Sequence, residues 1–230
     1  MSVMTEQNNG VKTFTPVTRR NFLKTAGLYL PAFKAMPGVA FSVRASNSPE
    51  DLISTLFPDT LFMTRKSWAW TGPVRSRLNT TTGFERLTVH HEGTAPHEKS
   101  DESELKSHIN NILSGHLEKG FGDMGYHFVI DTQGRIWEAR STRYEGAHVA
   151  SANKNNLGVM LLGNFDLQQP SQEQVATLHK LIIAAMQCYE IPLSHIYGHC
   201  DLAASACPGK KLYKMHIAKF RQMQEVSRKV

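Results

Sequence analysis

Residues 195–209 place an imidazole and a thiol eight positions apart, at His199 and Cys207, in a segment that a Pro-Gly pair interrupts. Zinc accepts both kinds of ligand, and a catalytic zinc takes three protein ligands and leaves a fourth position for water. A third ligand must then come from elsewhere in the chain. The best candidate is His90, because residues 87–89 (Leu-Thr-Val) predict a β-strand that would hold its side chain in place.

Spacing alone leaves two interpretations of these residues open. The chain has no zinc-finger spacing, no HExxH sequence and no cluster of four thiols. A His/His/Cys zinc site and an ordinary set of packed or hydrogen-bonded side chains therefore remain equally open. Only one of the two adjacent histidines can face the site. Strand side chains alternate, so His91 must face away from His90.

Five blocks in a fixed order carry a resemblance to a known family. They are TRKSWAW (64–70), LTVHHEG (87–93), GFGDMGYHFVIDTQGRIWEAR (120–140), GAH (146–148) and LGVMLLGNF (157–165). The chain resembles the zinc-dependent N-acetylmuramoyl-L-alanine amidases of the peptidoglycan recognition protein and phage-lysozyme-type (amidase type 2) superfamily. The resemblance implies the fold of that family. It also implies hydrolysis of the amide between N-acetylmuramic acid and L-alanine of the peptidoglycan stem peptide.

Carried over residue by residue, the resemblance implies that His90, His199 and Cys207 bind one zinc ion. It places Tyr126 beside the water that the zinc activates, where the phenol orients that water or donates a hydrogen bond to the oxyanion. Ser205 stands two positions before the cysteine, where related enzymes carry Lys or Thr. We therefore assign catalytic roles to Tyr126 and Ser205.

The resemblance further implies that His148 and Asn153 line the groove that holds the peptide stem. Asp201, two residues after His199, is positioned to hold the loop or a ligand imidazole. Glu92 stands where the family commonly carries Thr or Ser, and the sequence assigns it no role. No carboxylate is identified as a general base.

Two other functions compete with a zinc amidase. The first is a peptidoglycan-binding module without catalysis; family members that only bind the polymer typically lack the ligand cysteine, whereas Cys207 is present. The second is another zinc hydrolase of cell-wall peptides, such as a carboxypeptidase, which the five ordered blocks disfavour. The presence of Cys207 favours the enzyme.

The charge of the chain is unevenly distributed. The net charge is +6, and residues 1–45 carry six basic side chains against one acidic side chain, so the remainder carries only +1. This distribution excludes a nucleic-acid partner, because the basic excess belongs to the leader. Within the leader, TRRNFLK (18–24) resembles a twin-arginine export signal and precedes a weakly apolar stretch and a Val-Arg-Ala site at 43–45.

We expect three segments: a twin-arginine signal peptide (1–45), an extension with a short helix (46–63) and the amidase domain (64–230). The twin-arginine translocation machinery and peptidoglycan are the expected partners, and the expected location is periplasmic or extracellular. No stable membrane span is expected, since that requires about 20 mainly apolar residues. Outside the zinc site, Cys188 and Cys200 form a disulfide in that compartment or remain free thiols; the second is favoured slightly.

Hydrophobic periodicity and turn signals predict the elements around these residues. We expect strands at 87–90, 126–130, 135–139, 159–162 and 194–197, and helices at 48–56, 99–116, 171–189 and 210–228. This alternation predicts an α/β fold, with a mixed central β-sheet flanked by about three helices. Trp68 and Trp70 are expected to pack in the core or on a groove wall, with a sugar-stacking platform as the alternative. His108 and His116 are expected to be ordinary surface residues.

Overall fold

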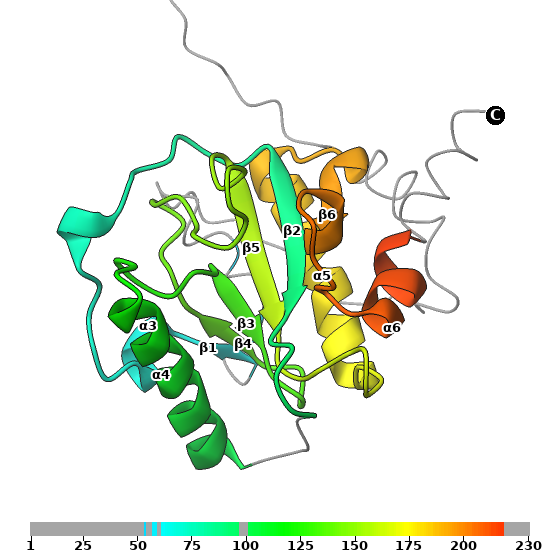
Figure 1. Ribbon diagram of the computed structural model, residues 1–230, viewed down its shortest axis with the longest axis horizontal. Helices are drawn as coiled ribbons and strands as arrows, with labels where there is room; N and C mark the ends of the chain where they lie inside the picture. Colours follow the sequence, from blue (N-terminus) through cyan, green and yellow to red (C-terminus); the bar gives the residue numbers. More distant parts are fainter. Residues whose placement is uncertain (1–52, 54–56, 59–60, 97–100, 219–230) are drawn as a thin grey trace, which may run out of the picture. The chain divides into compact units, whose positions relative to one another are not determined.

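The computed structural model describes residues 53, 57–58, 61–96 and 101–218 (Figure 1). Within them six strands form one sheet in the order β1-β4-β3-β5-β2-β6. The strands are β1 (Phe62–Met63), β2 (Arg86–His91), β3 (Phe128–Ile130), β4 (Ile136–Glu138), β5 (Asn156–Leu161) and β6 (Ile196–Gly198). Only the β3–β4 pair is antiparallel, so the sheet is mixed, as the sequence predicts.

The two long strands at the centre, β2 and β5, are covered on both faces. They run parallel in a register that pairs Thr88 with Gly158 and His90 with Met160. Every residue of β5 is buried. Because strand side chains alternate, β5 contributes Leu157, Val159 and Leu161 to one core and Met160 to the other.

Two long helices pack against opposite faces of the sheet. Helix α5 (Gln172–Tyr189) packs its buried leucines into the core that contains Val159, and α4 (Glu102–Glu118) packs Leu105, Ile109 and Leu113 into the other (Figure 1). Two short helices, α3 (Arg65–Trp68) and α6 (Lys210–Leu212), complete the helices described. The predicted α/β fold with a mixed sheet between helices is confirmed.

Caps and a turn explain where these elements begin. The Asp101 side chain accepts the amide of Glu104 at the start of α4. Ser171 forms a capping box with Gln174 at the start of α5. Between β3 and β4, Gly134 has φ of +80°, a conformation that glycine adopts without strain.

Several sequence expectations differ from the structure. Strand β1 carries no sequence signal that predicts it. Trp68 is buried and donates its indole N–H to the Glu138 carbonyl, but Trp70 is 65% exposed, so it does not pack in the core. After α6 the chain makes a π-helical turn at Tyr213–Ile217.

Some expectations lie outside the described residues. They are the signal peptide, most of the extension at 46–63 and the last part of the predicted helix at 210–228. Ile53 is described; it is helical and buried in the core. No helix among the described residues is long and apolar enough to cross a membrane.

Candidate metal centre

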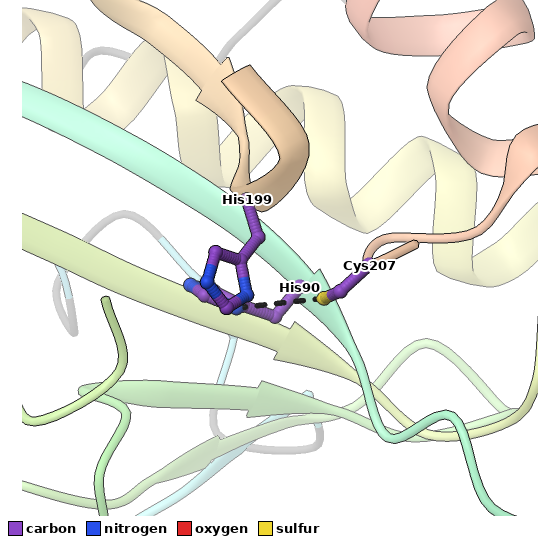
Figure 2. Close-up of side chains that lie close together, drawn as sticks. All are labelled: His90, His199 and Cys207. Carbon is purple, nitrogen blue, oxygen red and sulfur yellow. Dashed lines mark hydrogen bonds between the residues drawn. The ribbon is translucent and has the colours of Figure 1, made fainter. Parts of the chain in front are cut away.

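Three side chains from distant parts of the chain converge beside the carboxyl end of β2 (Figure 2). His90 lies near the end of β2, His199 begins the 3-10 turn His199–Asp201 directly after β6, and Cys207 lies on the loop that follows. One donor atom from each lies within 4.8 Å of the others. Because β6 pairs with β2, the sheet brings His199 to the end of the strand that carries His90.

The donor set fits zinc in chemistry and in spacing. His90 Nδ1 and Cys207 Sγ are 3.5 Å apart. Zn–N bonds of about 2.0–2.1 Å and a Zn–S bond of about 2.3 Å, at a tetrahedral angle, put those two atoms about 3.6 Å apart. Three protein ligands of this type leave a fourth position, which is the arrangement of catalytic zinc sites.

Burial shifts the pKa of two of these side chains in opposite directions. It raises the pKa of the Cys207 thiol to about 12, although the His91 amide donates to its sulfur at 3.3 Å. It lowers the pKa of His90 well below its ordinary value, and the His148 and His199 rings lower it further. His90 therefore keeps a nitrogen lone pair at neutral pH, and a metal ion bound here would displace the thiol proton of Cys207.

Tyr126 lies beside the cluster, just before β3. Its ring centroid is 5.0 Å from that of His90 and 6.1 Å from that of His148. Burial raises the pKa of the phenol, and the negative charges of Cys207 and Glu92 raise it further. The hydroxyl therefore keeps its proton at neutral pH and remains a hydrogen-bond donor.

His148 contacts the cluster directly. Its Nδ1 lies 2.9 Å from Nε2 of His90, and its own Nε2 lies 3.1 Å from the carbonyl oxygen of Asn156. The backbone of His148 is held in turn by Asn153, whose side-chain oxygen accepts the amides of His148 and Val149, both at 2.8 Å. Burial lowers the pKa of His148 to about 4.

Asp201 and Ser205 support the loop that carries His199 and Cys207, which we call the metal loop (residues 199–207). Asp201 accepts the Gly198 amide at 2.8 Å and the Tyr213 hydroxyl at 2.6 Å. The half-buried Ser205 accepts the Cys207 amide at 3.1 Å. Both contacts hold the loop that carries His199 and Cys207, so the expectation that Asp201 supports this loop agrees with the structure.

Comparison with known proteins places the chain in a family. Residues 80–210 match the family described as N-acetylmuramoyl-L-alanine amidase, and this match spans more than half of the chain. The chain belongs to this amidase family. Among individual relatives, it is 32% identical over 127 residues to a peptidoglycan-recognition protein of Drosophila simulans, covering 55% of this chain and 69% of the relative.

Solved structures share the fold of this amidase domain. Bumblebee peptidoglycan recognition protein SA is similar with a TM-score of 0.60 and 28% identity, over 66% of this chain and 91% of that one. The N-acetylmuramoyl-L-alanine amidase LysC from Clostridium intestinale is similar with a TM-score of 0.58 and 20% identity, over 74% of this chain and 99% of that one. The expectation of an amidase fold of the peptidoglycan recognition protein type is therefore confirmed.

A pocket of about 260 Å³ in the amidase domain adjoins the segment that leads to His148. Asn153 and Ala147 line it together with Phe121 and two arginines, Arg77 and Arg140. The Arg140 guanidinium is largely committed to structure, since it donates to the carbonyls of Met124 and Glu145. Asn153 lines this pocket and His148 is not among its lining residues, and the role of both in holding the peptide stem stays a prediction.

Sequence reasoning missed three polar residues near the amidase site. His116 was expected to be an ordinary surface residue, yet its half-buried ring accepts the Gly125 amide at 3.1 Å and stacks on Phe121. His108 lies 2.9 Å from the Glu92 carboxylate, and this contact raises the pKa of His108. The helix predicted at 99–116 contains both histidines, as α4 does, but helical spacing does not reveal their partners.

The remaining cysteines of the amidase domain carry free thiols. Cys188 is half-buried on α5, packs against the core, and burial raises its pKa. Cys200 is exposed on the metal loop, where its amide donates to the Cys207 carbonyl at 2.8 Å. The structure has no Cys188–Cys200 disulfide, in agreement with the favoured expectation.

Proposed function

We propose that this protein is a zinc-dependent N-acetylmuramoyl-L-alanine amidase, which hydrolyses the amide between N-acetylmuramic acid and the L-alanine of the stem peptide. The family match supports the reaction class. The observation that carries the proposal is the 3.5 Å separation of His90 Nδ1 and Cys207 Sγ, with His199 completing the set. A module that only binds the polymer has no need for a half-buried thiol at tetrahedral spacing from an imidazole.

In this mechanism His90, His199 and Cys207 hold the ion. When bound, zinc supplies a hydroxide nucleophile at neutral pH, by lowering the pKa of water from 15.7 to about 7, and polarises the amide carbonyl. Tyr126 keeps its phenolic proton and donates it as a hydrogen bond to the carbonyl oxygen as negative charge develops there.

Two further residues position the substrate and the loop. Asn153 lines the pocket, and we propose that it contacts the peptide stem there. Ser205 supports Cys207 through the amide of that residue, and its hydroxyl proton is available for the oxyanion. We expect a smaller contribution from Ser205 than from Tyr126, because Ser205 is only half-buried.

The test is to replace Cys207 by Ser in the full chain and to measure binding and cleavage separately. The wild-type protein should contain one zinc per chain and release stem peptides from peptidoglycan, with the cleaved amide identified by mass analysis. Cys207→Ser exchanges a soft anionic ligand for a neutral hydroxyl, so it should lose zinc and release no peptide. It should still sediment with peptidoglycan.

The control variant is Cys188→Ser, which alters a thiol of the same chain away from the metal site. It should retain zinc and activity. Wild-type protein that holds zinc and binds peptidoglycan but cleaves no amide would instead be a binding module. Products cut within the peptide would assign a carboxypeptidase or related hydrolase.

We further propose that the enzyme is exported to the periplasm or beyond through the twin-arginine machinery, with residues 1–45 as signal peptide and 64–230 as the amidase domain. Arg19 and Arg20, followed by Phe22 and Leu23, support this proposal. Replacing both arginines by lysine keeps the charge and should leave precursor in the cytoplasm. Normal export of that variant would contradict it.

A further inference from the structure

The imidazole of His148 connects the backbone of β5 with a predicted metal ligand. On one side its Nε2 faces the carbonyl oxygen of Asn156 at 3.1 Å, and on the other its Nδ1 faces Nε2 of His90 at 2.9 Å. The opposite nitrogen of His90, Nδ1, faces the Cys207 sulfur at 3.5 Å. Asn156, His148, His90 and Cys207 therefore form a continuous chain of contacts.

Two glycines make the room for this ring. A Cβ on Gly158 would lie 2.5 Å from Cδ2 of His148, and a Cβ on Gly146 would lie 2.6 Å from its Nε2. Real Cβ atoms do not approach other atoms so closely. The imidazole is thus held between a glycine of β5 and a glycine two residues before itself, with little freedom to turn.

The donor and acceptor roles of the ring nitrogens follow from the contact of His148 with the Asn156 carbonyl. A carbonyl oxygen only accepts, so the proton of a neutral His148 ring must lie on Nε2. The ring is buried, and the rings of His90 and His127 lie beside it. Its Nδ1 is then a lone pair, and only a protonated Nε2 of His90 can form the 2.9 Å contact.

Resting on the zinc site of the proposed function, we propose that His148 is a positioning residue that sets the tautomer and orientation of His90. The Asn156 carbonyl orients His148, and His148 in turn holds the proton of His90 on Nε2. The lone pair of His90 Nδ1 is thereby directed at the metal position next to Cys207. Hydrogen-bond partners of this kind fix ligand imidazoles in many metal sites.

This role changes what is expected of His148 toward the substrate. Both ring nitrogens are engaged within the protein, and the residue is only 9% exposed. Neither nitrogen is left for the peptide stem. Loss of His148 should therefore weaken zinc binding first, and weaken peptidoglycan binding only as a consequence.

Two amide substitutions separate this role from simple packing, because each imitates a different nitrogen of the ring. Asn at position 148 carries an oxygen near the place of Nδ1 and can still accept from His90. Gln reaches instead toward the Asn156 carbonyl and offers no acceptor at the Nδ1 place. Leu fills the volume and offers neither.

The experiment measures the zinc dissociation constant of the full-length variants by competition with a chromogenic chelator. We expect an increase of about 10–100-fold for His148→Leu and His148→Gln. We expect His148→Asn to stay within about threefold of wild type. The matched control is His127→Leu, at an equally buried histidine that bonds only to backbone, and it should leave zinc affinity unchanged even if it lowers stability.

Nitrogen-15 spectra of the imidazoles provide a readout that does not depend on folding of the variants. In wild-type protein, with and without zinc, the proton should lie on Nε2 of both His148 and His90. A proton on Nδ1 of His148, or unchanged zinc affinity in both His148→Gln and His148→Leu, would overturn the proposal. Wild-type protein that binds no zinc would overturn the proposed function, while the tautomers of the zinc-free protein would still decide the orientation of His90.

Discussion

Two buried histidines, His127 and His148, lie with ring centroids 6.1 Å apart and differ in one partner. Burial lowers the pKa of both, to about 3 for His127 and about 4 for His148. The Nε2 of each faces a backbone carbonyl. The Nδ1 of His127 accepts the Gly158 amide, whereas the Nδ1 of His148 faces the His90 ring.

This difference shows that burial and residue type do not mark a functional histidine. Both ring nitrogens of His127 bond to backbone groups, so His127 serves the fold alone. The ring of His148 contacts His90, a predicted metal ligand, and thereby orients it. Gly158 serves both, since its backbone pairs with His127 while its missing side chain makes room for His148.

Removal of the metal should have the largest effect on activity, and a variant of His127 should not change that effect. A chelator should reduce amide hydrolysis on the order of 10³-fold, because the Lewis acid contributes several kcal/mol to the transition state. Added zinc should restore the rate. His127→Gln should respond to chelator and zinc as wild type does, because His127 does not touch the site. Zinc content is measured by atomic emission. Hydrolysis that persists in zinc-free protein would contradict the proposed role of zinc in the reaction.

Tyr126→Phe tests the other ring that lies beside both His90 and His148. Turnover should fall about 10²–10³-fold, because a donor to the developing oxyanion is lost. Zinc affinity should remain within about twofold, since the phenol is not a ligand. Steady-state kinetics and chelator competition on the same preparation provide the two numbers. A large loss of zinc affinity would instead place Tyr126 with His148 among the groups that hold the ligands.

Gly158→Ala should act on His148 without removing it. The new methyl group would collide with the ring, since the three atoms nearest to it all belong to His148, so we expect the ring to shift and its contact with His90 to weaken. We expect zinc affinity to fall about tenfold, near the lower end of the effect of losing such a partner. Zinc affinity equal to wild type, in a variant whose circular dichroism shows the native fold, would show that the ring tolerates displacement.

The acid stability of zinc-free protein should report on His127. Its pKa is about 3 in the folded state against about 6.5 when unfolded, so below pH 6.5 the unfolded chain binds the proton first. Stability is therefore complete above pH 6.5 and falls as the pH drops toward 3, by up to about 1.4 kcal/mol per pH unit. His127→Gln should reduce that slope of urea unfolding free energy by up to this amount. An unchanged slope would mean that His127 already takes up a proton in the folded protein.

Much of the fold could be predicted because its signals are local. Alternation within one strand separates His90 from His91, and Ser171 with Gln174 begins α5 as a capping box. The turn at Gly134 follows from its need for a positive φ. These features depend on neighbours in sequence, which periodicity and turn chemistry describe directly.

The expectations that were wrong depend on contacts with distant residues. Core packing was one expectation for both Trp68 and Trp70, yet only Trp68 is buried. His116 was expected at the surface but accepts the Gly125 amide beside Tyr126. Strand β1 pairs with β4, 74 positions away at Phe62 and Ile136, and two residues carry no periodic pattern.

By itself, the sequence determined which residue types this protein has for chemistry: two imidazoles and a thiol, a tyrosine and a Gly-Ala-His segment. Only the tertiary structure decided which nitrogen of His90 faces Cys207, and that His148 faces the other. The orienting group is the backbone carbonyl of Asn156. Every residue has such a carbonyl, so sequence cannot single one out. Its role arises because the folded chain places the His148 ring between the Asn156 carbonyl and His90.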